Sequence, residues 1–448
     1  MNKHIVDDAR RCLQCKNPLC IQGCPVETPI KDAIHLLLSD GIQQAGRLLF
    51  DNNPLSIVCS LICPQENQCE GHCILGKKGV PVHISAIEQY ISDYYLSLYK
   101  PTAPAQGQEQ GKAAIIGSGP AGITIAFYLA QKGHRVTIYD GNERIGGILR
   151  YGIPEFRLPK GILDRLGHAL AGLGVKIRPN TTIGASLNLD ELFRDGFDAV
   201  FMGTGVWRPK KLGIQGESLG HVHFAIEYLR NPDVYNLGGR VLVVGAGNVA
   251  MDVARTALRH GSSEVCVACY GEESAVTAQP VEMEYAKIDG VRFIFNKAAL
   301  AFTEEGALLA DTRAVADGTR AVADGVGAVA DGTGAVADGT GATADDTRAT
   351  ADGVGAFELV PGSQQLYPAD SIIVAIGQGP RAVIVSSTKG IEVGASGLVV
   401  ADDSGRTTRQ GVFASGDVVT GARTVVEAVR RSRQVAGAMD AYIRALRG

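Results

Sequence analysis

The residues best suited to chemistry in this sequence are its ten cysteines, most of which fall in two runs near the start. The runs read Cys12-x2-Cys15-x4-Cys20-x3-Cys24-Pro25 and Cys59-x3-Cys63-Pro64-x4-Cys69-x3-Cys73. Closely spaced cysteines with a further one followed by proline are typical of [4Fe–4S] ligands, in which that last thiolate serves a second cluster. In a reducing compartment such a density of thiols favours ligation over disulfides. The runs therefore predict two four-iron clusters.

A structural zinc site is the alternative for these cysteines. Structural zinc needs closed tetrahedral ligand sets, usually two CxxC-like pairs for each metal. Only Cys12 and Cys15 have that spacing. Clusters are therefore favoured over zinc, and disulfides are favoured least.

A second kind of chemistry is indicated by two glycine-rich turns, each between an apolar strand and a helix. In the first, Gly117 makes the turn, Gly119 lets the backbone approach a pyrophosphate, and Gly122 lets the helix pack on the strand. Asp140, at the end of the next strand, is placed to accept a hydrogen bond from a ribose hydroxyl. The first turn comprises Gly117, Ser118, Gly119, Pro120, Ala121 and Gly122; the second comprises Gly245, Ala246, Gly247, Asn248, Val249, Ala250, Met251 and Asp252.

Two such turns in one chain predict an FAD held in the first and a nicotinamide nucleotide visiting the second. The elements that position these motifs are predicted to be two nested Rossmann-like α/β domains preceded by an all-α iron–sulfur domain. We expect the helical domain at 1–105, a linker at 101–111, the FAD domain at 112–237 and 371–448, and the NAD(P) domain at 238–370.

A degenerate seven-residue repeat occupies 311–356. Its glycines and alanines cannot form a coiled-coil seam, so we expect an inserted surface loop, with a small β-solenoid as the alternative. The net charge of -4 gives no basic excess and favours neither a nucleic-acid nor a membrane partner. Without an apolar run of about 18 residues or a signal-peptide core, the chain is expected to be cytoplasmic.

The order of motifs resembles one family over nearly the whole chain outside the repeat. CLQCKNPLCIQGCPV, VCSLICPQENQCEGHC, GSGPAG, GGILRYGIPEFRLPK, GAGNVAMDVART, AIGQ and ASGDVVTGARTVVEAV carry the resemblance. They are similar to the small subunit of bacterial glutamate synthase, the amino-terminal half of dihydropyrimidine dehydrogenase, and flavoprotein subunits of electron-bifurcating ferredoxin reductases.

The resemblance implies two interleaved ligand sets, with Glu88 in place of an eighth thiolate and Cys59 as a spectator. One cluster would be held by Cys12, Cys15, Cys20 and Cys73, and the other by Cys24, Cys63, Cys69 and Glu88. It also implies FAD contacts from Gly147, Leu149, Arg150, Thr204, Gly416 and Asp417. The resemblance also implies a larger partner subunit that is catalytic or accepts electrons. A ferredoxin-linked subunit is one form that this partner can take, and a hetero-oligomer is expected.

One departure from the family concerns the nucleotide. NADPH-using relatives carry an arginine pair after the second nucleotide strand, where this chain has Glu272 and Glu273. Carboxylates there repel a 2′-phosphate and suit a ribose hydroxyl. NADH is therefore favoured, unless Arg255 or Arg259 supplies the positive charge.

Two other functions stay open at this point. A thioredoxin-reductase-like enzyme would use a CxxC beside the flavin, and Cys266 and Cys269 have that spacing. On a strand, however, residues i and i+3 point to opposite faces, which favours simple packing. A non-catalytic cluster assembly module is the other alternative, although the intact glycines of both turns argue against it.

Overall fold

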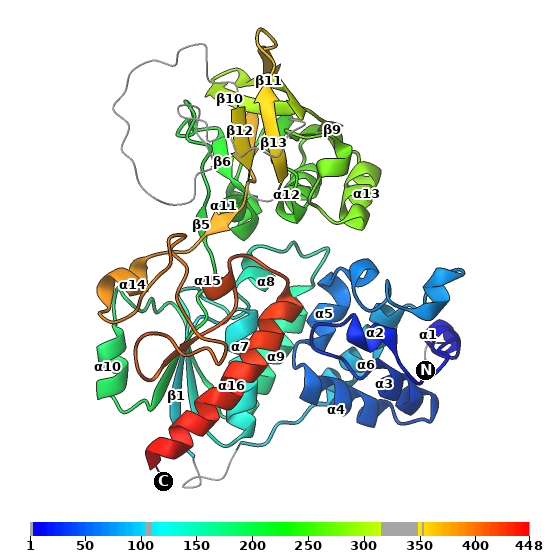
Figure 1. Cartoon of the computed structure of the whole chain (residues 1–448), viewed down its shortest axis with the longest axis vertical. Coiled ribbons are helices and arrows are strands. Elements are labelled where there is room, and N and C mark those ends of the chain that lie inside the picture. Colours follow the sequence, from blue (N-terminus) through cyan, green and yellow to red (C-terminus); the bar gives the residue numbers. More distant parts are fainter. Residues whose placement is uncertain (1–2, 104–109, 315–347, 352–353, 448) are drawn as a thin grey trace.

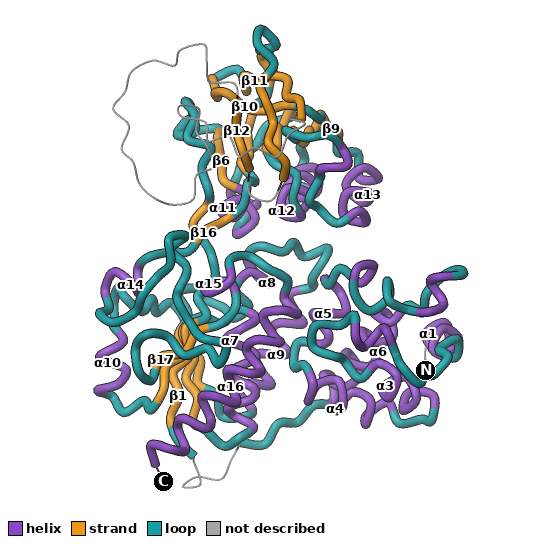
Figure 2. Tube along the Cα trace, in the orientation of Figure 1, coloured by secondary structure: helices purple, strands orange, loops and turns teal. Residues whose placement is uncertain are grey.

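The computed structural model describes residues 3–103, 110–314, 348–351 and 354–447, which form three units (Figure 1). A helical unit is followed by a parallel sheet, and a second sheet lies across from the first (Figure 2). This arrangement confirms the predicted fold class, an α/β chain with two Rossmann-like units after an all-α unit.

The helical unit carries the clustered cysteines. Helix α3 (Ile30–Leu38) is amphipathic and buries Ile30, Ile34 and Leu37 on one face. These side chains pack with Leu49 of α4 and Ile87 and Ile91 of α6. The helices are α1 (Lys3–Ala9), α2 (Leu19–Gln22), α3 (Ile30–Leu38), α4 (Ile42–Asn52), α5 (Ser56–Ile62) and α6 (Ile84–Leu98).

The first sheet is parallel, has the strand order β17-β4-β1-β2-β3 and is covered by the long helix α16 and by α7 (Figure 1). The central strands β1 and β4 are nearly continuous apolar runs because both faces of the sheet are buried there. They are β1 (Lys112–Ile116), β2 (Arg135–Tyr139), β3 (Lys176–Arg178), β4 (Ala199–Met202) and β17 (Val412–Ala414). The helices of this unit are α7 (Pro120–Gln131), α8 (Ile148–Tyr151), α9 (Lys160–Gly172), α10 (Leu189–Arg194), α14 (Val383–Ser387), α15 (Asp417–Thr420) and α16 (Val425–Arg447).

The second sheet is also parallel, with the order β6-β15-β7-β8-β9. Its strands are β6 (Val222–Phe224), β7 (Arg240–Val244), β8 (Glu264–Ala268), β9 (Arg292–Ile294) and β15 (Ser371–Val374). Its helices are α11 (Ala225–Arg230), α12 (Asn248–Arg259) and α13 (Pro280–Asp289).

The unit borders differ from those expected at 237 and 371. Both β6 and β15 pair in the second sheet, where β15 lies between β6 and β7. The chain passes between the units at a two-stranded ribbon, β5 (Arg208–Pro209) with β16 (Gln378–Gly379). The second unit therefore begins before β6 and ends after β15.

The predicted insertion also has different edges from those expected. Its first residues, 311–314, continue β11 (Gly306–Ala314), and its last residues belong to β12 (Arg348–Ala351) and β13 (Val354–Leu359). These strands join β10 (Lys297–Thr303) in the antiparallel order β10-β11-β13-β12, with β14 (Gln365–Pro368) also pairing with β11. The rest of the repeat, 315–347 and 352–353, lies outside the described residues, as does the linker segment 104–109.

The helical unit is fixed on the first sheet unit by polar and aromatic contacts. Phe50 meets Phe127 edge to face at 5.2 Å. The Asn52 carbonyl accepts a 2.7 Å bond from the Tyr128 hydroxyl, and Asn52 Oδ1 accepts a 3.0 Å bond from Arg433. The cysteine-bearing unit and the first glycine turn therefore belong to one packed body.

Candidate functional site

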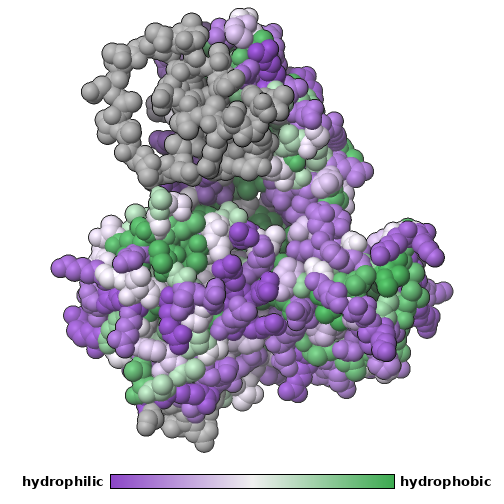
Figure 3. Space-filling model, in the orientation of Figure 1, coloured by the Kyte–Doolittle hydropathy of each residue, from purple (hydrophilic) through white to green (hydrophobic). Residues whose placement is uncertain are grey.

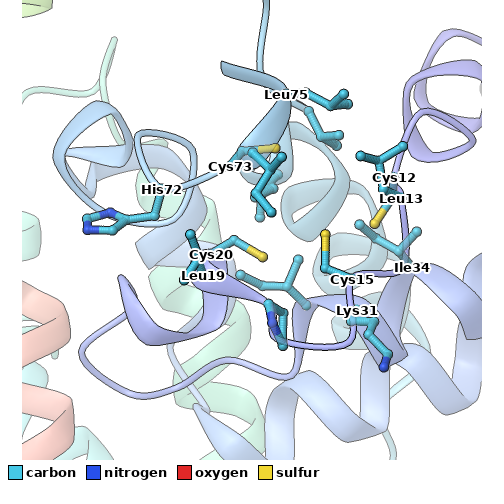
Figure 4. Close-up of a pocket in the computed structure, with 15 residues that line it drawn as sticks. Cys12, Leu13, Cys15, Leu19, Cys20, Lys31, Ile34, His72, Cys73 and Leu75 are labelled. Carbon is cyan, nitrogen blue, oxygen red and sulfur yellow. The ribbon is translucent and has the colours of Figure 1, made fainter. Parts of the chain in front are cut away.

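The first cysteine site is a pocket in the helical unit lined by Cys12, Cys15, Cys20 and Cys73 (Figure 4). Figure 4 shows their sulfur atoms around a shared space, whereas the imidazole of His72 points away. Apolar side chains including those of α3 form the wall. Burial raises the pKa of Cys12, and raises that of Cys20 to about 11. The structure thus brings together the four thiols assigned to one cluster.

The second ligand set gathers around a carboxylate. Burial, and then the charge of Glu88, raises the pKa of Cys69, and both also raise that of Cys24. A hydrogen bond with Cys59 raises the pKa of Cys63, with burial, the Cys59 charge and then the Glu88 charge adding to it. The charge of Glu88 therefore acts on all three thiols that the resemblance grouped with it.

The carboxylate of Glu88 provides the strongest evidence for a bound group at the second cysteine set. Its Oε1 is buried without a hydrogen-bond partner among the described residues, and burial raises its pKa to about 8. A buried polar atom without a partner needs an explanation, and an iron ligated by the carboxylate supplies one. By contrast, the buried Cys59 thiol accepts a 3.3 Å hydrogen bond from Asn53 Nδ2. The donor set therefore fits a cluster held through Glu88.

No group of three or more His, Cys, Asp or Glu side chains in the described part of the chain is gathered tightly enough for a single metal ion. All ten cysteines are free thiols.

A cavity of about 850 Å³ joins the helical unit and both sheet units. Ile62 and Cys63 form part of its wall, so the second cysteine set adjoins it. Its lining includes many predicted cofactor contacts: Gly117, Gly119, Pro120, Ala121, Asp140, Gly147, Thr204, Gly416, Asp417, Gly247, Asn248, Val249 and Asp252. Arg157, Trp207, Arg230, Thr277 and Gln279 also line it, and sequence reasoning had not singled them out.

The first turn is shaped for close backbone approach. Gly117 has φ +96°, and a Cβ added at Gly122 would lie 1.9 Å from the Gly117 carbonyl oxygen. Asp140 accepts 2.7 Å bonds from the backbone N–H groups of Ser118 and Asn142. Its carboxylate therefore holds the turn together at the edge of the cavity.

Two further loops complete this side of the cavity. Gly147, at φ +52°, would bring a Cβ to 2.7 Å from the Gly119 Cα, so only glycine leaves the two loops in contact. Burial raises the pKa of Asp417, at the start of α15, to about 6. Leu149 is fully buried, and Arg150 forms a 2.6 Å bond with Asp164. Neither Leu149 nor Arg150 is among the lining residues.

The second turn presents the start of α12. Gly245 has φ +129°, and an added Cβ would lie 2.4 Å from the Ala375 carbonyl oxygen. Ala250 is buried in the core of its unit and, like Gly122 and Gly245, supports the turn without being among the lining residues. Asn248 Oδ1 accepts a 2.8 Å bond from the Gln279 N–H, which holds α13 against the turn.

The guanidinium groups of Arg255 and Arg259 form ion pairs within the second unit and do not face the cavity. Arg255 is buried and bonds Glu282 at 3.1 Å and Asp289 at 2.8 Å, and Arg259 bonds Asp289 at 2.6 Å. Neither is among the residues that line the cavity. The exposed Glu273 pairs with Lys287, and the exposed Glu272 accepts a bond from Ser274.

Cys266 and Cys269 pack on opposite faces of the second sheet, each in a different core. Burial raises the pKa of both, that of Cys269 to about 12. Neither lines the cavity, so this pair does not provide a disulfide beside a flavin.

Two known protein families match consecutive parts of the chain. Residues 1–98 match the family described as dihydropyrimidine dehydrogenase domain II, 4Fe-4S cluster, and 111–432 match pyridine nucleotide-disulphide oxidoreductase. The protein is thus an FAD-dependent pyridine nucleotide oxidoreductase with an iron–sulfur domain.

More particularly, the chain belongs to the glutamate synthase small chain family. It is 32% identical to the glutamate synthase (NADPH) small chain of Halomonas elongata over 97% of this chain and 90% of that one. Identity to the Escherichia coli K12 small chain is 31%, over 96% of this chain and 89% of that one. The NADP(+)-dependent formate dehydrogenase subunit beta of Moorella thermoacetica is 32% identical over 95% of this chain and 60% of that one.

Solved structures share the fold of the two sheet units. Mycobacterium tuberculosis FprA in complex with NADPH aligns with a TM-score of 0.57 at 16% identity, over 75% of this chain and 85% of that one. Thioredoxin reductase of T. acidophilum aligns with a TM-score of 0.53 at 19% identity, over 73% and 97%. Among the described helices, none has both the length and the apolar character needed to span a bilayer.

Proposed function

We propose that this chain is the electron-transfer subunit of a larger oxidoreductase, carrying electrons between NAD(P)H, one FAD and two [4Fe–4S] clusters. The observation that carries this proposal is the position of Cys63, which belongs to the second ligand set and also lines the cavity shared by both glycine turns. That adjacency supports electron exchange between the flavin site and the nearer cluster.

The redox chemistry is supplied by the cofactors, and the chain binds and orients them. Gly117 and Gly119 admit a pyrophosphate to the start of α7, and Gly247 does the same at α12. The first cysteine pocket is lined mainly by apolar side chains. The two ligand sets differ in donor type because one includes the hard carboxylate of Glu88 in place of a soft thiolate, which supports different potentials for the two clusters.

A larger partner subunit is part of the proposal. The names of the relatives, small chain and subunit beta, support it. Polar side chains dominate the face in Figure 3, with apolar ones gathered over parts of it. Leu13 and Ile74 line the first cysteine pocket and are 60% and 39% exposed, which supports partner contact near that cluster.

The test is cofactor analysis followed by anaerobic titration with NADH and NADPH. We expect one FAD and about eight irons per chain, with bleaching of both flavin and cluster absorbance and reduction of an artificial dye without a partner. An iron content of about four per chain would refute the second cluster, and zinc without sulfide would refute both clusters. Bleaching of flavin alone would favour the disulfide-reductase alternative, and no bleaching would favour the assembly module.

We further propose that NADH is preferred to NADPH. Glu272 and Glu273 are exposed after β8, and the guanidinium groups of Arg255 and Arg259 are bound to carboxylates. A 2′-phosphate placed there would meet like charge. Steady-state dye reduction with each nucleotide decides the matter, and a marked NADPH preference would contradict the proposal.

A further inference from the structure

A buried group of charges joins the two sheet units. The loop between α8 and α9 belongs to the first unit and carries Arg157 towards the second. Arg157 Nη1 lies 3.0 and 2.8 Å from the two carboxylate oxygens of Asp252 on α12. Its Nη2 lies 2.7 Å from Glu282 Oε1 on α13. The side chains of the three residues are 10%, 4% and 9% exposed.

The same charges continue into the second unit. The other carboxylate oxygen of Glu282 binds Arg255 at 3.1 Å, and Arg255 and Arg259 share Asp289. Three arginines thus face three carboxylates, so the formal charges balance. Phe156, next to Arg157 in the loop, places its ring 4.7 Å from the Arg255 guanidinium and 4.2 Å from that of Arg259.

This arrangement is better suited to fixing an orientation than to adding stability. Removing charges from water offsets most of their mutual attraction, so a buried ion pair contributes little net stability. A guanidinium bound to two carboxylates is nevertheless strongly directional. Any rotation of the second unit against the first would separate Arg157 from Asp252 or Glu282 and leave buried charge without a partner.

Arg157 and Asp252 also line the cavity onto which both glycine turns open. We infer that Arg157 is a positioning residue, which clamps α12 and α13 of the second unit to the loop of the first and so sets how a bound nicotinamide nucleotide faces the flavin. The inference rests on the proposed function. It assigns to the GIPEFRLPK loop a role in the relative placement of the two units.

The test compares Arg157→Ala, Arg157→Lys and Asp252→Asn with Arg240→Ala in the flavin-loaded protein. Arg240 is the matched control because its 2.6 Å pair with Asp370 lies within the second unit. Stopped-flow reduction of the flavin by NADH and by NADPH gives the limiting rate and the nucleotide Kd separately. Wild-type reduction tests the proposed function, and the ratio of variant to wild type tests the clamp.

We expect Arg157→Ala to keep its flavin and its nucleotide Kd while the limiting rate falls about 10- to 100-fold, as a displacement near 1 Å produces. Arg157→Lys should recover part of the rate because lysine can pair with one carboxylate but cannot bridge two. Hydrogen exchange in residues 153–158 and in α13 should rise in Arg157→Ala and not in the control.

An unchanged limiting rate and exchange in Arg157→Ala would overturn the inference. A Kd that rises with no change in the limiting rate would also overturn it, because Arg157 would then be a nucleotide-binding residue. If Arg157→Ala does not fold, Arg157→Lys and Asp252→Asn decide by the same readouts, since Asp252→Asn removes the charge with almost no change in volume.

Discussion

Glu88 shows how a single residue changes meaning with its surroundings. Near the start of α6 its spacing is that of an ordinary helical glutamate, and such residues usually face water. Here one carboxylate oxygen is instead buried beside Cys24, Cys63 and Cys69 and has no hydrogen-bond partner among the described residues. Cys59, which belongs to the cysteine run by spacing, has Asn53 and Cys63 as partners.

Replacing Glu88 and Cys59 separately tests this assignment. Glu88→Ala should remove or alter one cluster, lowering the iron content from about eight towards about four and changing one EPR signal, with FAD retained. Cys59→Ala should leave iron content and both EPR signals as in the wild type. The reverse pattern, with a cluster lost in Cys59→Ala and kept in Glu88→Ala, would make Cys59 the ligand.

The link between β1 and α7 shows at the scale of elements why glycine position matters more than glycine content. At Gly122, inside α7, there is no room for a Cβ because the Gly117 carbonyl lies against it. At Gly437, inside α16, nothing lies within 4 Å of an added Cβ. The same substitution should therefore have opposite signs in the two helices.

Gly122→Ala should push α7 away from the first turn, costing about 1–3 kcal/mol of unfolding free energy and lowering FAD occupancy. Gly437→Ala should add about 0.5–1 kcal/mol because alanine loses less backbone entropy in a helix. Denaturant unfolding and the flavin-to-protein absorbance ratio measure both effects. Equal shifts in the two variants would show that the close contact at Gly122 is relieved by local rearrangement.

For the whole molecule, the sequence predicted the three units because the cysteine spacing and the strand–turn–helix order are local signals. It misplaced the unit borders, since β15 reads as an apolar strand whichever sheet it joins, and only pairing with β7 decides. The sequence motif GIPEFRLPK marks the loop that contains Arg157, but it does not predict the partners of Arg157. These partners are Asp252, 95 positions away, and Glu282, which is further on. Contacts between units leave no periodicity in a single sequence.

The strands at the edges of the repeat also make contacts that no sequence pattern predicts. Within 311–314, the Thr312 hydroxyl donates to the Tyr270 carbonyl, and Asp311 pairs with Lys297 at 2.5 Å. Phe357 of β13 stacks on the Tyr270 ring at 4.9 Å. These contacts support the segment after β8, beside the glutamates proposed to select the nucleotide. Deleting 311–356 would remove Asp311 and Thr312, and with them two of these three contacts.

Two deletions separate the repeat from its supporting strands. Ala314 and Arg348 lie on either side of β13, about 10 Å apart across two strand spacings, so a linker of about four to six Gly and Ser residues can replace 315–347. This deletion should leave FAD content, thermal stability and the KM for NADH near wild type, because the described residues that line the cavity lie outside 280–377.

Deleting 311–356 should instead lower the Tm and raise the KM for NADH. Thr312 is then lost, and the part of β13 that carries Phe357 can no longer pair with β11. Thermal melts followed by flavin fluorescence, together with dye-reduction kinetics, compare the two proteins. If the shorter deletion alone abolishes FAD binding, the repeat takes part in the fold, as the solenoid alternative requires; if both deletions behave as wild type, the strands at its edges do not support the nucleotide site.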